Sequence, residues 1–202
     1  MIAIVDYGVG NLFSLSSSVK SLGAEIRVTR DADDLRAADH ILLPGVGAFA
    51  DAMAKLEATG LVPVIKEEAA QKPLLGICLG MQLLFEKSCE YGEHDGLGFV
   101  PGQVCPLAPD LGDKSLKVPQ IGWNAVHILR DDPLFKYVRD GEYFYYVHSY
   151  YGKNCAANTL AVSDYSLPVT GVVKAGKVYG TQFHPEKSGD AGLRLLKAFS
   201  EL

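Results

Sequence analysis

The sequence contains no apolar run long enough to cross a membrane. A spanning helix needs about 20 consecutive apolar residues, whereas the richest uncharged stretch, residues 73–85, is shorter and is interrupted by glycines. The first residues reach Asp6 too early for the apolar core of a signal peptide. We therefore expect no membrane partner and a cytoplasmic location.

The sequence also lacks any block of one charge. Lys and Arg total 19 and Asp and Glu total 24, so the formal net charge is -5 at pH 7. Nowhere do five consecutive residues carry the same sign. A nucleic-acid-binding surface needs a basic stripe to neutralise phosphates, so we expect no nucleic-acid partner.

Cysteines are few and scattered. Cys78, Cys89, Cys105 and Cys155 do not form the dense framework of a small disulfide-rich protein. None belongs to a C-x-x-C pair, and no cluster of His and Cys has zinc spacing. We expect no metal and no other cofactor, and a reducing compartment in which one cysteine can act as a free thiol.

The chain is long enough for one domain with a full core. It has 202 residues, of which 48% are hydrophobic and 21% charged, so residues 1–202 are predicted to form a single domain. Strand and helix patterns alternate in the first half, and strands dominate the second. This order predicts an α/β fold: a mostly parallel but mixed sheet with helices on both faces.

The predicted elements follow from apolar runs and from helical spacing of apolar residues. Strands are predicted at 2–5, 25–29, 40–43, 74–77, about 104, 126–129, 143–147, 160–162, 169–173 and 178–183. Helices are predicted at 12–22, 33–38, 48–56, 61–71, 81–87 and 192–199. In such sheets ligands bind beyond the carboxyl ends of the strands. Four Gly-rich or polar segments follow predicted strands there: DYGVGN (6–11), PGVGAF (44–49), GICLG (76–80) and HPEKS (184–188).

The segment GICLG has the form of a nucleophile elbow with cysteine in place of serine. A sharp strand-to-helix turn would present the Cys78 side chain above the sheet, and the flanking glycines avoid collisions in the tight bend. A helix N-terminus favours the thiolate, and the N–H of Leu79 is placed to stabilise an oxyanion. The alternative is a buried structural cysteine, which is the commoner role of an isolated free cysteine.

The segment HPE provides a base and a group to orient it. A thiol nucleophile needs a base within hydrogen-bond reach, and that base needs a third group to hold its ring. His184 and Glu186 are two residues apart, so on an extended chain they point to the same side. The alternative is a surface pair of little consequence. His148, beside Ser149 at the end of an aromatic strand, is the main other candidate base.

With these residues in place, the chain resembles the class I (triad) glutamine amidotransferases, whose signature is G-x-C-x-G followed far downstream by H-P-E. Finer motifs resemble the glutaminase subunits of imidazole glycerol phosphate synthases, which act in histidine biosynthesis. They are DYGVGN, PGVGAF, CLGMQLLFE (78–86), KVPQIGWN (117–124), YVHSY (146–150) and HPEKS. Two positions depart from the pattern: Gln120, where His is common, and Phe13, where Arg is frequent.

The resemblance implies a reaction and a role for each matched position. Cys78 would attack the side-chain amide of L-glutamine, His184 would protonate the departing ammonia, and water would hydrolyse the glutamyl thioester. The matched positions are the triad Cys78, His184 and Glu186, the oxyanion contacts Val46, Gly47 and Leu79, and the glutamine contacts Gln82, Glu90, Ser149 and Tyr150.

The resemblance also implies a partner. Such glutaminases form a heterodimer with a (β/α)8-barrel cyclase, which uses the ammonia to make imidazole glycerol phosphate and an aminoimidazole carboxamide ribotide. Trp123, Tyr145 and Lys187 match positions at that junction. Family members are poorly active alone and are activated by the cyclase and its nucleotide ligand, so we expect the same here.

Other functions remain open at this level. The nearest is the glutaminase subunit of another class I enzyme, for pyridoxal phosphate, anthranilate or purine synthesis. A cysteine hydrolase or protease could use the same elbow, although Gln82 and the order of the HPE motif disfavour it. A dinucleotide-binding module is disfavoured because Phe13 stands where a G-x-G-x-x-G fingerprint needs a small residue.

Overall fold

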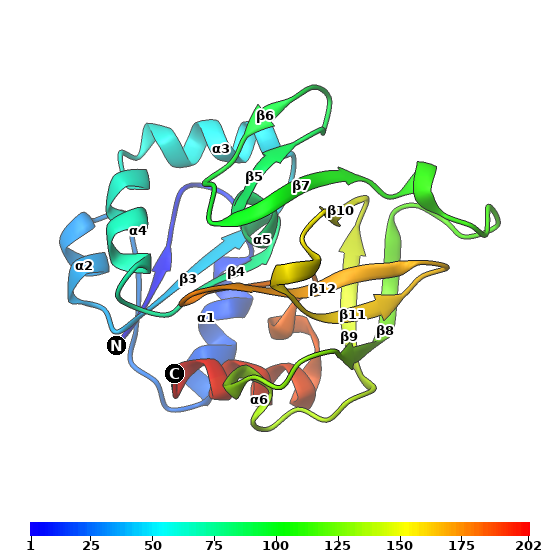
Figure 1. Cartoon of the computed structure of the whole chain (residues 1–202). Helices are drawn as coiled ribbons and strands as arrows, with labels where there is room; N and C mark the ends of the chain where they lie inside the picture. Colours follow the sequence, from blue (N-terminus) through cyan, green and yellow to red (C-terminus); the bar gives the residue numbers. More distant parts are fainter.

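The computed structural model describes residues 1–202 and is built around one nine-stranded sheet (Figure 1). The strand order is β2-β1-β3-β4-β13-β12-β11-β8-β9. The strands are β1 (Ile2–Val5), β2 (Ile26–Thr29), β3 (His40–Gly45), β4 (Leu74–Cys78), β8 (Gln120–Ile128), β9 (Glu142–His148), β11 (Thr159–Asp164), β12 (Pro168–Ala175) and β13 (Val178–Thr181). The first five in spatial order are parallel, and the remainder pair antiparallel. The sheet is therefore mixed, as the sequence predicts.

Helices cover both faces of the parallel half of the sheet. They are α1 (Leu12–Ser21), α2 (Ala32–Ala37), α3 (Phe49–Ala58), α4 (Val62–Ala69), α5 (Leu79–Leu83) and α6 (Gly189–Ser200). Short 3-10 turns occur at η1 (Ala108–Asp110), η2 (Pro133–Phe135), η3 (Ala156–Asn158) and η4 (Pro185–Lys187). Residues of α2, α3 and α4 share one apolar cluster with one face of the sheet, and residues of α1 and α6 share a second with the other. All four residues of β1 are buried because they lie between these two layers.

Local sequence explains where the first two helices begin. The Asn11 side chain accepts a hydrogen bond from the N–H of Ser14 at 3.2 Å and so caps α1. Asp31 accepts from the N–H of Asp33 at 2.8 Å and caps α2 in the same way. Each cap satisfies a backbone donor that a helix leaves free at its first turn.

A second sheet of four strands lies beside the elbow and was not predicted. Its order is β10-β7-β5-β6, with β5 (Phe85–Ser88), β6 (His94–Asp95), β7 (Val100–Pro106) and β10 (Tyr150–Lys153). The helix predicted at 81–87 is therefore present only as far as Leu83, where α5 ends, and is wrong beyond it, because Phe85 begins β5 opposite Val100. Short apolar runs suit a buried strand as well as a helix, and here the pairing with distant β7 decides.

Strand β3 is longer than predicted. It continues through Pro44 to Gly45, and Pro44 pairs with Ile77 of β4. Pairing with β1 on the other side ends at Leu42. Pro44 therefore needs no N–H on that side, which makes proline acceptable in an interior strand. The extension brings the PGVGAF segment to the same sheet edge as the end of β4.

Candidate active site

Cys78 is the last residue of β4 and lies on a strained turn into α5. Its φ is 55° and its ψ is -110°, a conformation that non-glycine residues adopt only where the surrounding fold enforces it. A Cβ on Gly76 would lie 2.6 Å from the carbonyl oxygen of Gly80. A Cβ on Gly80 would lie only 1.8 Å from the carbonyl oxygen of Leu43 in β3. The predicted elbow is present, and both glycines are required by close backbone approach.

His184 reaches the same sheet edge from β13. Strands β4 and β13 are parallel neighbours, with Thr181 opposite Ile77, so the residues that follow them meet. The Nδ1 atom of His184 lies 2.8 Å from Oε1 of Glu186, and both side chains are buried. Glu186 belongs to the turn η4 rather than to the extended chain assumed from the sequence. The turn, led by Pro185, still folds the carboxylate back onto the imidazole.

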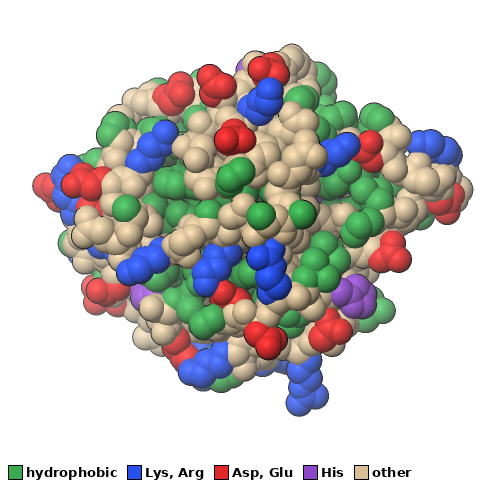
Figure 2. Space-filling model, in the orientation of Figure 1, with side chains coloured by type: hydrophobic (Ala, Val, Ile, Leu, Met, Phe, Trp, Pro, Cys, Tyr) green, Lys and Arg blue, Asp and Glu red, His purple; other side chains and the backbone are tan.

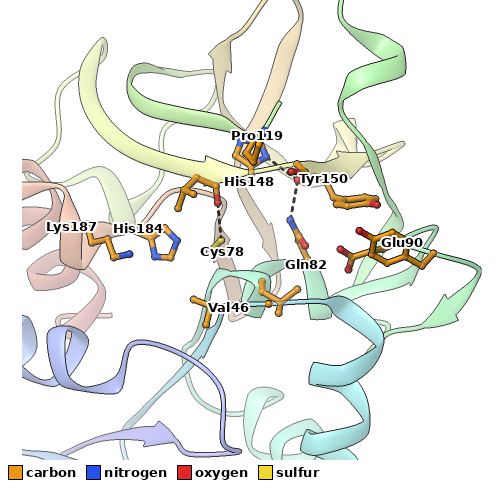
Figure 3. A pocket seen from close by; sticks show the side chains of 14 residues that line it. Val46, Cys78, Gln82, Glu90, Pro119, His148, Tyr150, His184 and Lys187 are labelled. Atoms are coloured by element: carbon orange, nitrogen blue, oxygen red, sulfur yellow. Dashed lines mark hydrogen bonds between the residues drawn. The ribbon is translucent and has the colours of Figure 1, made fainter. Parts of the chain in front are cut away.

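The other ring nitrogen of His184 faces the cavity. Its Nε2 atom is buried and has no hydrogen-bond partner in the protein. Figure 3 shows the imidazole beside the Cys78 side chain. Burial by itself lowers the pKa of His184, but the Cys78 sulfur and the Glu186 carboxylate raise it to about 9. The ring is therefore protonated at neutral pH and can deliver a proton at the position of the sulfur.

These side chains share one cavity of about 450 Å³, within the size range of small-molecule sites. The cavity lies where β3, β4 and β9 end and where the small sheet meets the large one (Figure 3). Its lining residues are Val46, Gly47, Cys78, Leu79, Gln82, Glu90, Tyr91, Pro119, Val147, His148, Ser149, Tyr150, His184 and Lys187. Ten residues were predicted for the triad, the oxyanion contacts and the glutamine contacts, and nine of them line this cavity. The tenth, Glu186, contacts His184 from outside the cavity.

Val46, Gly47 and Leu79 come together because the end of β3 lies against the start of α5. A Cβ on Gly45 would be 2.7 Å from the backbone nitrogen of Gly80. Gly47 has a φ of 101°, a value that favours glycine. The helix α5 has only five residues, so its dipole is shorter than the sequence-based argument assumed.

Gln82 and Glu90 are buried residues that line the cavity; Gln82 precedes β5 in the chain and Glu90 follows it. The Gln82 amide donates to the carbonyl oxygen of Tyr150 at 3.0 Å and to Oε1 of Gln182 at 3.1 Å. Glu90 accepts from the backbone N–H of Phe49 at 2.5 Å. This contact caps α3, which has no side-chain cap from its own N-cap residue Ala48. Glu90 therefore joins the small sheet to the helix layer.

The three predicted interface residues form one cluster at the rim. The rings of Trp123 and Tyr145 meet edge to face at 6.1 Å between centroids. The ammonium group of Lys187 lies 5.9 Å from the centroid of the Tyr145 ring. Only Lys187 also lines the cavity, while Trp123 is 52% exposed. An aromatic cluster open to solvent beside a cavity is typical of a binding surface.

Gln182 was not predicted from the sequence, and His148 was predicted only as the other candidate base. The Gln182 amide nitrogen is 3.8 Å from the Cys78 sulfur. Gln182 precedes His184 by two residues, so the alternation used for Glu186 could have found it. His148, the other candidate base, has no carboxylate partner: its ring contacts the Tyr150 carbonyl and the Gln120 side chain. The structure therefore gives His148 a different setting from that of His184.

Comparison with known proteins agrees with this geometry. The sequence profile of glutamine amidotransferase class-I matches residues 3–201. The imidazole glycerol phosphate synthase subunit HisH of Listeria monocytogenes is 47% identical, and the match covers 100% of this chain and 96% of the relative. The HisH subunit of Bacillus cereus is 48% identical, with 98% and 93% covered. The chain belongs to the class I glutamine amidotransferases, in the HisH family.

Solved structures support the fold of this amidotransferase. One described as a crystal structure of glutamine amidotransferase has a TM-score of 0.75 at 19% identity, covering 99% of this chain and 100% of that chain. The structure of PurLQS from Thermotoga maritima has a TM-score of 0.74 at 18% identity, covering 99% and 97%. At these identities the likeness concerns the fold alone.

The surface and the remaining side chains of the amidotransferase add three observations. On the face drawn in Figure 2, both basic and acidic side chains occur. No group of three or more His, Cys, Asp or Glu side chains is arranged to hold a metal ion. None of the helices combines the length and the apolar character needed to cross a membrane.

The raised pKa of His184 predicts a pH dependence of stability. A group whose pKa rises from 6.5 to about 9 on folding stabilises the folded state when protonated. That contribution is complete below the unfolded value of 6.5 and is lost as the pH rises through about 9. The free energy of unfolding is expected to fall across this window, and urea unfolding at several pH values measures it. The fall should shrink in His184→Gln but persist in His94→Gln on β6, and equal falls in both variants would contradict the assignment.

Proposed function

We propose that the chain hydrolyses L-glutamine to glutamate and ammonia through a thioester on Cys78. The observation that carries the proposal is the position of the His184 imidazole, in one cavity with Cys78 and 2.8 Å from Glu186. A base held by a carboxylate beside a strained, cavity-lining cysteine is the arrangement that nucleophilic acyl transfer requires.

The steps follow from these positions. Cys78 attacks the side-chain amide carbon of glutamine as the thiolate, and the imidazolium of His184 gives its proton to the departing ammonia. The now neutral His184 takes a proton from water, which attacks the thioester; glutamate leaves, and the Cys78 thiolate and the protonated His184 are regenerated. Glu186 keeps the ring oriented and stabilises its positive charge.

The remaining cavity residues have complementary roles in the proposal. The N–H groups of Leu79 and of the Val46–Gly47 segment stabilise the oxyanion that forms in each step. Gln82, Glu90, Ser149 and Tyr150 bind the substrate. Support comes from their shared cavity, because Leu79 directly follows the nucleophile and the Val46–Gly47 segment lies against the start of α5.

We further propose that the chain works as one domain, residues 1–202, in the cytoplasm. The two apolar clusters flank a single sheet, which supports one folding unit. All four cysteines are free, and a thiol nucleophile is preserved in a reducing compartment.

The named relatives are subunits of imidazole glycerol phosphate synthase. We propose that the partner here is a (β/α)8-barrel cyclase, which takes the ammonia in histidine biosynthesis and forms a heterodimer with this chain.

Glutamate release with and without the cyclase tests both the activity and the partner. Release is expected to be slow for the chain alone and faster when the cyclase subunit and its nucleotide ligand are added. Trp123→Ala should weaken the complex about 30-fold, because exposed Trp residues at interfaces often contribute about 2 kcal/mol or more. Titration of the cyclase against glutamate release measures this change.

A matched control is Leu129→Ala, which removes another exposed apolar side chain, beyond the opposite end of β8. Its titration should coincide with that of the wild type. Equal titrations for Trp123→Ala and the wild type would contradict the proposed interface. No glutamate release by the folded complex would contradict the glutaminase activity itself.

A further inference from the structure

His148 lies in the cavity wall between two oxygen atoms. Its Nδ1 atom is 2.9 Å from the carbonyl oxygen of Tyr150, and its Nε2 atom is 3.0 Å from Oε1 of Gln120. His148 is 6% exposed and Gln120 is fully buried. Neither ring nitrogen contacts a carboxylate. A neutral imidazole has one N–H, so it cannot donate to both oxygens.

The surroundings of His148 keep it neutral. Burial lowers the pKa of the ring to about 4, the Tyr150 carbonyl offsets only part of this effect, and the nearby His184 lowers the pKa further. Because His184 is the protonated member of the pair, a second positive ring beside it would be repelled. At neutral pH, one ring nitrogen of His148 therefore carries no hydrogen. The group that contacts this nitrogen must donate a hydrogen bond to its lone pair.

The Tyr150 contact decides which nitrogen carries the hydrogen. A carbonyl oxygen can only accept, so Nδ1–H donates to Tyr150 and Nε2 holds the lone pair. Gln120 must then present its amide NH2 group to Nε2. The two orientations of a glutamine amide fill the same space and are distinguished by their hydrogen bonds. In the orientation drawn, the Gln120 amide donates to Oδ1 of Asn124 at 2.9 Å, and the Asn124 amide donates to the Asp164 carbonyl at 3.4 Å. When the Gln120 amide turns over, the Asn124 amide turns over with it, donates to the Gln120 oxygen and gives up the long contact with Asp164.

The effect reaches the cavity through Tyr150. Its carbonyl oxygen accepts from His148 and also from the amide of Gln82 at 3.0 Å. The second N–H of Gln82 is used by Gln182. With both hydrogens occupied, Oε1 is the atom that Gln82 can offer to a ligand in the cavity. The direction of that oxygen depends on the position of the Tyr150 carbonyl.

We propose that Gln120 and His148 are positioning residues: Gln120 donates to Nε2, holds His148 as the Nδ1–H tautomer, and so fixes the Tyr150 carbonyl that orients Gln82 toward glutamine. The step from Gln82 to substrate rests on the proposed glutaminase activity. The tautomer of His148 does not depend on it. The two parts are therefore tested separately.

Nitrogen-15 NMR of the histidine rings tests the tautomer in the wild-type protein. The His148 signal is assigned by its absence in His148→Gln. At neutral pH we expect a protonated Nδ1 and an unprotonated Nε2. An Nε2–H tautomer or a doubly protonated ring would overturn the proposal. This reading needs no variant of Gln120 to fold.

Kinetics with the cyclase complex test the effect on glutamine. Gln120→Leu, which cannot donate, is expected to raise the KM for glutamine about three- to tenfold, the loss of one net hydrogen bond. Its kcat should stay within about twofold, because substrate binding is affected rather than the chemical step. Gln120→His, whose ring N–H can still donate a hydrogen bond, should keep the wild-type KM for glutamine.

The matched control is Gln71→Leu, an exposed glutamine after α4 that lies outside the cavity. Its KM should be unchanged. An unchanged KM in a folded Gln120→Leu, or a fall in kcat alone, would overturn the role of Gln120. If the wild-type complex releases no glutamate, the proposed function fails, and the NMR result still decides the tautomer of His148.

Discussion

Replacing Cys78 by alanine is expected to abolish glutamate release, with a loss on the order of 10⁴-fold or more. Without the sulfur no thioester can form, and the alanine methyl group offers no other nucleophile. The remaining cavity would still bind glutamine through groups that do not react. Glutamate release should be measured in the presence of the cyclase and its nucleotide ligand, so that the wild-type rate is well above the detection limit.

Two controls make this result specific. Cys89→Ala removes an exposed cysteine outside the cavity and should leave the rate unchanged. Thermal unfolding should show that Cys78→Ala is folded, because the substitution removes one sulfur atom where the second apolar cluster borders the cavity. The double variant Cys78→Ala/His184→Ala should be no slower than Cys78→Ala, since the two groups act as a unit. A Cys78→Ala enzyme within tenfold of the wild type would show that another group is the nucleophile.

Replacing Gly80 by alanine is expected to lower the free energy of unfolding by about 3 kcal/mol or more. The added Cβ would lie 1.8 Å from the carbonyl oxygen of Leu43 and 2.9 Å from its carbonyl carbon. Both atoms belong to β3, which lies between β1 and β4 in the large sheet. The backbone there can move only by breaking strand pairing, so α5 must move instead.

Moving α5 also affects the cavity, because Cys78 directly precedes this helix. A shift of about 1 Å in a reacting group can cost on the order of 10²-fold in rate. Any Gly80→Ala protein that folds is therefore expected to release glutamate much more slowly than the wild type. Urea unfolding and glutamate release measured on the same preparation separate the two effects.

Gly112→Ala is the matched control for this substitution. The nearest atom to a Cβ at Gly112 is the carbonyl oxygen of Ser166 at 3.6 Å, an ordinary contact distance. Its stability should stay within about 1 kcal/mol of the wild type. Equal stabilities for Gly80→Ala and Gly112→Ala would mean that the close approach of α5 to β3 is not a constraint in solution.

The sequence by itself determined the fold class and identified the three side chains for which we propose the chemistry. Apolar runs alternating with helical spacing predicted the mixed sheet and its two helical layers. The glycines around Cys78 and the HPE motif are local patterns, set by what a tight turn and a neighbouring carboxylate require. Such patterns can be recognised without knowing what lies across the fold, and for this reason Cys78, His184 and Glu186 could be named from sequence.

Only the tertiary structure decided the features that depend on contacts between distant segments. The strand β5 was predicted as a helix because its apolar residues suit both, and its pairing with β7 is a long-range contact. Alternation places Gln182 on the same side of the chain as His184, but the roles of Gln182 and Gln120 come only from the partners around them. The Gln120–His148–Tyr150 connection joins β8, β9 and β10. Hydrogen-bond direction in such a buried set is fixed by all its members together, and no segment of the sequence contains that information alone.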